Sequence, residues 1–435
     1  MVESTLLSQK IIKPSSPTPS SLRCHNLSFL DQITKSTYVP VASFYSKPTN
    51  YNIIQISHIL ENSLSKVLSS YYPFAGKIMN NKYVDCNDIG AEYFNVRVNC
   101  PMSKVLNNLN NDAIKVAFPQ DLPWGSCTSS LDQSPLVVQL SHFDCGGIAV
   151  SVCISHKVAD GYSLYKFLND WAATARDDQL DFKPSPQFGV INTLYPPMDD
   201  PPPESEIESE PQQCVSRMFH FSSSNLGRLK DIVVKGSGVQ NPTRVEVATA
   251  LLHKCGVLAS STSAENHPAG MFKPSLLVHI MNLRPPLPLK AIGNAVSSFS
   301  VTATMKDEIH VPIFVDKLRK AKQHSRDKFR DIKPNQLFSH SLERSKEAAE
   351  MLKSNDIYFC SSHCNFGLYT IDFGWGRPIR VTPTSYPRQN GVIFLDDQSG
   401  EGINVLINLA EADMLIFQRD EELLEFASPI HQSPQ

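Results

Sequence analysis

The stretch Ser155-His156-Lys157-Val158-Ala159-Asp160-Gly161 joins a strand pattern to a helix pattern. Upstream, apolar residues alternate with smaller ones at the period of a half-buried strand, at Ile148, Val150, Val152 and Ile154. His156 has the same parity as these residues, so its imidazole is expected to face the apolar side. Downstream, apolar residues repeat at helical spacing, at Leu164, Phe167, Leu168, Trp171 and Ala175. The pattern predicts a helix from Gly161 to Arg176.

His156 and Asp160 have two interpretations. An ordinary one is a buried histidine beside an aspartate that caps the helix and suits its dipole. The other is a general base, because a histidine that faces a pocket can take a proton near neutral pH. Asp160 would then orient the imidazole or hold the loop in shape.

Arg284 is a candidate ionic partner for Asp160. It ends a predicted strand whose apolar residues alternate, at Leu276, Val278 and Ile280. An aspartate paired with an arginine is a structural brace, so this interpretation is favoured for Asp160 over a proton relay. The alternative for Arg284 is an exposed arginine at the end of a strand.

Length and composition exclude several classes of protein. The 435 residues exceed a usual single domain, and a chain that is 41% hydrophobic and 19% charged is globular. The net charge of −3 is not the excess of positive charge that is typical of proteins that bind nucleic acid. No stretch approaches the roughly 20 apolar residues that span a bilayer, and residues 1–21 are too polar for a signal peptide. The ten cysteines include no CxxC pair or zinc-like spacing, so we expect no metal site and a cytoplasmic location.

Residues 181–213 are rich in proline and acidic residues, which is typical of a solvated, semi-rigid linker that packs little. They predict an N-terminal domain over 1–180 and a C-terminal domain over 214–435. Both halves mix strands and helices without regular βαβ alternation, so the fold class is predicted as α+β with two domains. Hairpins are expected from Val84–Asp88 with Tyr93–Val98, and from Gly391–Leu395 with Gly402–Leu409.

Other common chemistries lack their motifs. The chain contains no GxSxG nucleophile elbow and no GxxxxGK[ST] phosphate loop. Gly374-Trp375-Gly376 lacks the third glycine and the ribose-binding acid of a dinucleotide site. His156 with Asp160 therefore remains the candidate for catalysis.

Two motifs together resemble those of a known family. His156-Lys157-Val158-Ala159-Asp160-Gly161 resembles the HxxxD motif, and Asp372-Phe373-Gly374-Trp375-Gly376 resembles the DFGWG motif, of the plant BAHD acyl-CoA-dependent acyltransferases. Their order and their separation of over two hundred residues also match. The resemblance covers essentially the whole chain, including Tyr72–Lys77, Asn282–Arg284 and Gly293-Asn294. Within the family the chain is most similar to alkaloid O-acetyltransferases, and acylsugar and some terpenoid acyltransferases share much of this signature.

The resemblance implies a fold and a mechanism. It implies two similar mixed α/β domains of the chloramphenicol acetyltransferase type, joined by a long crossover, with an active-site channel at their interface. His156 would deprotonate the acceptor hydroxyl, which attacks the thioester carbonyl directly without an acyl-enzyme. The family's counterpart of Asp160 points away from the substrate and pairs with the counterpart of Arg284. The family's DFGWG motif is structural, which assigns Asp372, Phe373, Gly374, Trp375 and Gly376 to architecture.

The expected function is transfer of acetyl from acetyl-CoA to a hydroxyl of an alkaloid or terpenoid alcohol. An alternative in the same class is acylation of a sugar or sugar ester with a branched or longer acyl group. An alternative class is a catalytically silent small-molecule binding protein. We expect a monomer with acyl-CoA as co-substrate, no bound cofactor, and no nucleic-acid or membrane partner. The resemblance departs at His363 and Asn365, where relatives often carry Trp and Arg, and this difference is expected to reshape the pocket.

Overall fold

Contacts within the chain define two compact units. A computed structural model describes residues 2–108, 112–120, 122, 134–176, 182–201, 214–263, 272–331, 356–384 and 388–430, with isolated positions at 336, 339, 343 and 350. The first unit combines Met1–Glu208 with Asn282–Val296 and Asn365–Thr384, and the second combines Ser209–Met281, Ser297–Cys364 and Ser385–Gln435. Two segments of the C-terminal half thus belong to the first unit, whereas the sequence predicted two continuous domains. The predicted boundaries near 180 and 213 lie outside the described residues and stay a prediction.

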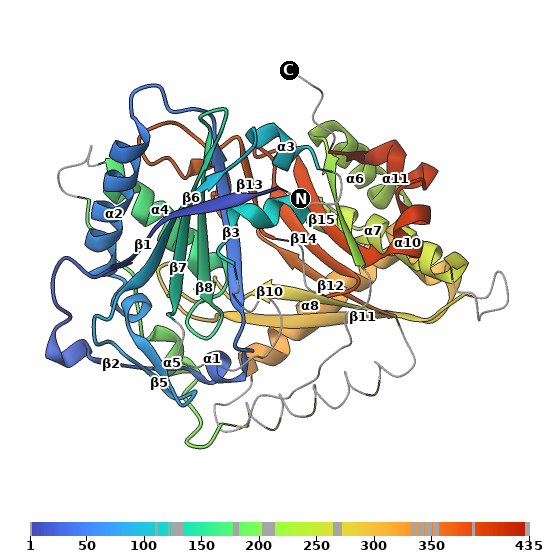
Figure 1. Cartoon of the computed structure of the whole chain (residues 1–435). Coiled ribbons are helices and arrows are strands. Elements are labelled where there is room, and N and C mark those ends of the chain that lie inside the picture. The colour runs from blue at the N-terminus through green and yellow to red at the C-terminus, as the bar shows by residue number, and fades with distance from the viewer. Residues whose placement is uncertain are drawn as a thin grey trace. The chain divides into compact units, whose positions relative to one another are not determined.

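A six-stranded mixed sheet forms the centre of the first unit (Figure 1). Its order is β1 (Ser4–Ile12), β6 (Ala91–Val98), β7 (Leu136–Phe143), β8 (Ile148–Ser155), β3 (Tyr38–Tyr45) and β13 (Arg380–Thr382). Strands β6 and β7 are parallel, and the other neighbours are antiparallel. Every residue of β7 and β8 is buried, as expected for central strands covered on both faces. Helices α2 (Ile53–Leu68) and α4 (Gly161–Arg176) lie side by side in this unit.

Short elements complete the first unit. A three-stranded sheet has the order β2 (Cys24–Asn26), β5 (Tyr83–Asp85) and β4 (Lys77–Met79). The remaining short helices are α1 (Phe29–Ile33), α3 (Met102–Leu106) and α5 (Val190–Leu194), with 3-10 turns at Ser20–Leu22, Tyr72–Ala75, Asp112–Ala117 and Leu368–Thr370.

The first predicted hairpin is wrong. Strand β5 pairs with β2 and β4, whereas β6 pairs with β1 and β7. Between them, Asp88 takes a left-handed conformation with φ of 59°. Its carboxylate accepts hydrogen bonds from the Thr18 N–H at 3.0 Å and the Thr18 hydroxyl at 2.6 Å. This anchored turn directs the chain from the small sheet into the large one.

Residues 182–201 of the predicted linker pack against the first unit. The ring of Phe188 lies edge-on to Tyr71 and Phe74, with centroids 6.0 Å away in both cases. Ile191 is 1% exposed, and Gln187 forms a parallel bridge with Ala291. The expectation that this stretch packs little is therefore wrong, because its few apolar residues enter the core.

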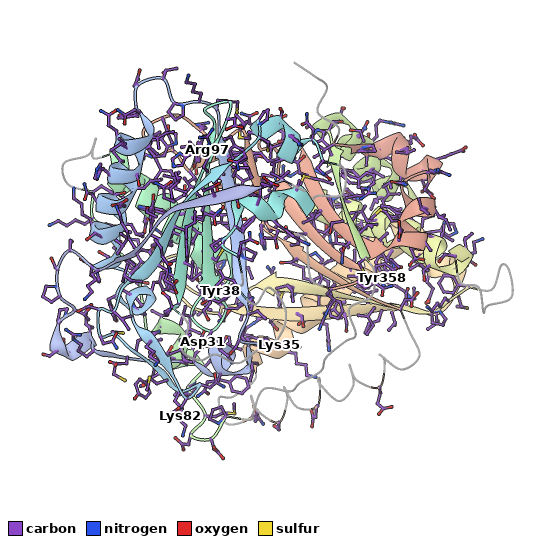
Figure 2. All side chains as sticks on the ribbon, in the orientation of Figure 1. Asp31, Lys35, Tyr38, Lys82, Arg97 and Tyr358 are labelled. Atoms are coloured by element: carbon purple, nitrogen blue, oxygen red, sulfur yellow. The ribbon has the colours of Figure 1, made fainter. Side chains whose placement is uncertain are left out.

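A seven-stranded mixed sheet organises the second unit. Its order is β11 (Val296–Ala303), β10 (Ser275–Asn282), β12 (Asp356–Ser362), β14 (Gly391–Asp396), β15 (Ile403–Ala410), β9 (Cys214–Phe221) and β16 (Ser428–Pro429). Strand β12 is parallel to β10 and β14. Strands β14 and β15 form the predicted second hairpin. Figure 2 labels Tyr358, a fully buried side chain of β12.

The helices of the second unit are α6 (Ser223–Ser237), α7 (Arg244–Ser263), α8 (Val311–Asp331), α10 (Glu411–Phe417) and α11 (Glu421–Phe426), with a 3-10 turn at Lys306–Ile309. A capping box starts α7: the Glu246 N–H donates to Thr243 Oγ1 at 3.1 Å, and the Thr243 N–H donates to Glu246 Oε2 at 2.8 Å. Both units thus combine a mixed sheet with helices, which agrees with the predicted mixed α and β class.

Candidate active site

His156 follows the last residue of β8, and Asp160 precedes the first residue of α4. The backbone N–H of His156 donates to the carbonyl of Thr37 at 2.7 Å, which fixes the chain as it leaves the strand. Asp160 Oδ1 accepts a hydrogen bond from the Ser163 N–H at 2.8 Å. This contact is a helix cap, so the ordinary interpretation of Asp160 is part of its role.

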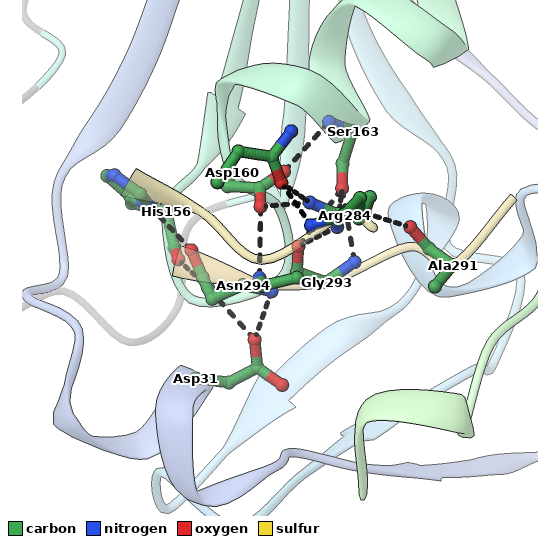
Figure 3. A network of polar contacts seen from close by, with 10 residues as sticks. Asp31, His156, Asp160, Ser163, Arg284, Ala291, Gly293 and Asn294 are labelled. Carbon is green, nitrogen blue, oxygen red and sulfur yellow. Dashed lines mark hydrogen bonds and ion pairs between the residues drawn. The ribbon is translucent and has the colours of Figure 1, made fainter. Parts of the chain in front are cut away.

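Asp160 forms a buried ion pair with Arg284, as the sequence suggested (Figure 3). Arg284 Nη1 lies 2.7 Å from Asp160 Oδ2, and the two side chains are 0% and 1% exposed. The same Oδ2 accepts the backbone N–H of Ala295 at 2.9 Å. The alternative of an exposed arginine at a strand end is excluded.

All five guanidinium hydrogens of Arg284 have acceptors. Besides Asp160, the acceptors are the Ala291 carbonyl at 3.0 Å, the Gly293 carbonyl at 3.1 Å, Ser163 Oγ at 3.2 Å and Asn282 Oδ1 at 3.1 Å. The guanidinium also lies 4.9 Å from the centroid of the Tyr162 ring. A saturated, buried arginine has no hydrogen left for a substrate, so the pair connects the His156–Asp160 loop to the segment that carries Arg284.

The imidazole of His156 contacts Asn294 rather than Asp160. Nδ1 lies 2.9 Å from Asn294 Oδ1, and the Asn294 Nδ2 donates to the His156 carbonyl at 2.6 Å. None of the hydrogen bonds that Asp160 makes with other described residues reaches the ring. Burial lowers the pKa of His156 below its ordinary value of 6.5, and the charge of Asp160 opposes this shift. The ring is therefore neutral at neutral pH, as a general base must be.

The DFGWG motif forms a rigid turn in the first unit. Asp372 Oδ1 accepts hydrogen bonds from the N–H groups of Gly374 at 2.8 Å and Gly376 at 3.0 Å. Both glycines have positive φ, 110° and 102°, a conformation that strains residues with a side chain. Phe373 stacks on Trp375 with centroids 5.5 Å apart.

The rings of this motif contact other aromatic side chains. Phe373 meets Trp171 of α4 edge-on at 4.9 Å and is 1% exposed. Trp375 meets Tyr45 of β3 edge-on at 6.1 Å and Tyr51 at 6.3 Å. Within the described residues, no hydrogen bond or ion pair links the motif to His156, so its contacts are those of a packing element.

Two residues that are linked to His156 by hydrogen bonds, Asn294 and Asp31, were not predicted as site residues from the sequence. Asn294 was noted only as part of Gly293-Asn294, and the structure places its side chain against the imidazole. Asp31 had no assigned role, yet its Oδ1 accepts from Asn294 Nδ2 at 2.9 Å. The sequence held one signal for Asp31, the spacing Ser28-x-x-Asp31 of a capping box before apolar residues.

In the part of the chain that the structure describes, no three His, Cys, Asp or Glu side chains gather in a way that could hold a metal ion. In the same residues no helix combines the length and apolar character needed to cross a bilayer.

Comparison with known proteins identifies the family. Residues 2–424 match the family model described as Transferase family. The chain belongs to the BAHD acyltransferases. It is 56% identical to acylsugar acyltransferase 3 of Solanum lycopersicum over 100% of both chains, and 38% identical to deacetylvindoline O-acetyltransferase of Catharanthus roseus over 98% of each. The crystal structure of vinorine synthase superposes with a TM-score of 0.83 at 30% identity, covering 98% of this chain and 99% of that one.

Family membership confirms three predictions from the sequence. The chain is a plant-type BAHD protein, its fold is that of vinorine synthase, and it is an acyl-CoA-dependent acyltransferase. The acyl-CoA is a co-substrate of this family.

Proposed function

We propose that this acyltransferase transfers an acyl group from an acyl-CoA to a hydroxyl of a sugar or sugar ester. His156 serves as the general base, and Asp160 with Arg284 holds the loop that carries it. The contact that supports this role is Nδ1 of His156 on Asn294, which leaves Nε2 as the ring nitrogen for the acceptor.

The reaction needs one base and no covalent enzyme intermediate. Nε2 of His156 takes the hydroxyl proton while the acceptor oxygen bonds to the thioester carbonyl carbon. The tetrahedral intermediate then collapses, the carbon–sulfur bond breaks, and the thiolate of coenzyme A takes the proton from His156. The products are an ester and the free thiol.

A sugar-type acceptor is favoured by sequence identity. The tomato relative named acylsugar acyltransferase 3 is 56% identical over the full length of both chains. Relatives named after alkaloid reactions are more distant, such as minovincinine 19-hydroxy-O-acetyltransferase at 38% and vinorine synthase at 31%. The proposal includes a branched or longer acyl donor, as in the acylsugar-type alternative drawn from the sequence.

Acetylation of an alkaloid or terpenoid alcohol is the second candidate. It is supported by the number of alkaloid enzymes among the relatives and by the structural similarity to vinorine synthase. A monomer in the cytoplasm remains our expectation, and the described cysteines, all of them free thiols, suit a reducing compartment.

A matched panel of acceptors separates the two candidates. Purified protein is incubated with acetyl-CoA, a branched short-chain acyl-CoA and a longer acyl-CoA, each with partially acylated sugars or with indole alkaloid alcohols. Thiol release gives the rate, and mass spectrometry identifies the product. Faster transfer to the sugars supports the first candidate, and faster transfer to the alkaloids supports the second.

The His156→Ala variant is the control for chemistry. It should bind acyl-CoA but release acceptor-dependent thiol about 100- to 10,000-fold more slowly than the wild-type protein. If wild-type protein binds the acceptors yet transfers no acyl group from any donor, the binding-protein alternative is favoured instead.

A further inference from the structure

Asp31 of α1 carries a buried carboxyl group, 2% exposed, near the start of β3 (Figure 2). One of its oxygens closes a capping box: Oδ2 accepts from the Ser28 N–H at 2.8 Å and the Ser28 hydroxyl at 2.6 Å. In return, the Asp31 N–H donates to Ser28 Oγ at 3.1 Å. This helix-capping role uses Oδ2 and leaves Oδ1 for other contacts.

Oδ1 of Asp31 holds the side chain of Asn294 in one orientation (Figure 3). It accepts the backbone N–H of Asn294 and the Asn294 Nδ2, both at 2.9 Å. The second hydrogen of Nδ2 goes to the His156 carbonyl at 2.6 Å. A reversed amide would place its oxygen against both of these acceptors, so the hydrogen bonds of this fully buried residue permit one orientation only.

The fixed amide determines which nitrogen of His156 carries the proton. Asn294 Oδ1 faces Nδ1 of the imidazole at 2.9 Å, and an amide oxygen can only accept a hydrogen bond. Nδ1 must therefore be the protonated nitrogen. A neutral imidazole carries one N–H, so its lone pair is on Nε2.

We propose that Asp31 is a positioning residue for catalysis: through Asn294 it holds His156 in the tautomer whose Nε2 accepts the proton of the acceptor hydroxyl. This inference rests on the proposed role of His156 as the base. Asp31→Asn removes one of the two acceptors that oppose a reversed Asn294 amide and leaves only the His156 carbonyl. The side-chain N–H of an asparagine at position 31 can instead donate to the oxygen of the reversed amide, whose own N–H then donates to Nδ1 and moves the imidazole proton to Nε2. A ring in that tautomer cannot take the hydroxyl proton.

The test compares Asp31→Asn with a matched capping variant, Gln55→Ala. Gln55 is the third residue of α2, and its Oε1 accepts from the Asn52 N–H at 2.9 Å, as Asp31 does for Ser28 in α1. Gln55 is exposed and makes none of the described contacts of the His156 network. Melting temperature, kcat and KM are measured for both variants.

Asp31→Asn should lower kcat by about 10- to 100-fold with little change in KM, the loss typical of groups that orient a ligating histidine. Gln55→Ala should keep the wild-type kcat. A folded Asp31→Asn protein with wild-type kcat, or an equal loss of kcat in Gln55→Ala, would overturn the proposal.

A spectroscopic measurement reports the tautomer directly. In protein labelled with ¹⁵N at its thirteen histidines, the His156 signals are assigned by their loss in His156→Ala. Wild-type protein should show protonated Nδ1, and Asp31→Asn should gain the form with protonated Nε2. A wild-type ring protonated on Nε2 refutes the proposal, even where Asp31→Asn fails to fold. If folded His156→Ala keeps more than a tenth of the wild-type kcat, the base assignment fails. If His156→Ala loses activity but Asp31→Asn keeps the wild-type kcat, only the role of Asp31 fails.

Discussion

Different kinds of interaction stabilise the loop from His156 to Asp160 and the turn from Asp372 to Gly376. The first is held by a buried ion pair and a saturated set of hydrogen bonds around Arg284. The second is held by two hydrogen bonds to one carboxylate and by stacked rings around Phe373. Polar contacts fix direction as well as position, whereas apolar packing mainly fixes position.

This difference shows that a motif can be highly specific for a family without taking part in the chemistry, and that a less specific motif can carry the catalytic group. HxxxD is a loose pattern, yet its histidine has both a lowered pKa and a neighbour, Asn294, that orients its ring. DFGWG is a longer and more specific pattern, yet Oδ1 of its aspartate, Asp372, accepts hydrogen bonds from the backbone of the motif itself. Four experiments test this contrast.

The largest effect is expected at His156. His156→Ala removes the proposed base and should lower kcat by about 100- to 10,000-fold, the usual contribution of general-base catalysis. Steady-state thiol release measures this loss, and circular dichroism verifies the fold. A folded variant with more than a tenth of the wild-type kcat would place the base elsewhere.

Asp160→Ala should act on stability first. The change leaves the Arg284 guanidinium and the Ala295 N–H buried without their acceptor, and breaking a buried pair in this way costs about 3–5 kcal/mol of unfolding free energy. Urea unfolding measures the cost. The control is Asp316→Ala, which removes the exposed pair with Lys320 and should cost no more than about 0.5 kcal/mol. A stable, fully active Asp160→Ala protein would contradict the proposed role of the Asp160–Arg284 pair in holding the loop that carries His156.

Phe373→Ala should separate stability from chemistry. Truncating this buried ring beside Trp171 and Trp375 should cost about 3–5 kcal/mol. The kcat of the protein that remains folded should stay near the wild-type value, because the ring makes no contact with His156 among the described residues. Activity and unfolding are compared at one temperature below the melting point. A loss of kcat in folded protein would bring this turn into the catalytic machinery.

The smallest effect is expected from pH near neutrality. Burial lowers the pKa of His156 below 6.5, so the base is already deprotonated at pH 7. The value of kcat/KM should therefore be flat from pH 7 upward and fall only as the pH decreases below 6.5. A profile from pH 5 to 9, with the fold verified at each end, measures the midpoint. A midpoint above 7 would contradict the burial of the ring.

The sequence predicted the elements whose pattern is local. Strand β8 and helix α4 have strong periods, and both occupy the predicted residues. The ion pair of Asp160 with Arg284 was also foreseen, because a buried carboxylate needs a cation and Arg284 ends a strand.

Apart from this ion pair, contacts between distant segments could not be predicted from the sequence. Asp31 and Asn294 are 263 residues apart, and no periodicity connects them. The first hairpin failed because Asp88 anchors a turn on Thr18, 70 residues away. The stretch 182–201 was expected to be solvated because proline and acid dominate its composition, while its packing depends on a few side chains such as Phe188.

The assignment of Asn282–Val296 to the first unit has a consequence for biosynthesis. A ribosome makes the N-terminal half first, and domains usually fold as they emerge. Here the nascent N-terminal half lacks the cation for Asp160 and the amide for His156 until about 80 further residues beyond 213 have been made. We expect a fragment truncated near residue 213 to aggregate and to gain solubility when a peptide spanning 282–296 is supplied in trans.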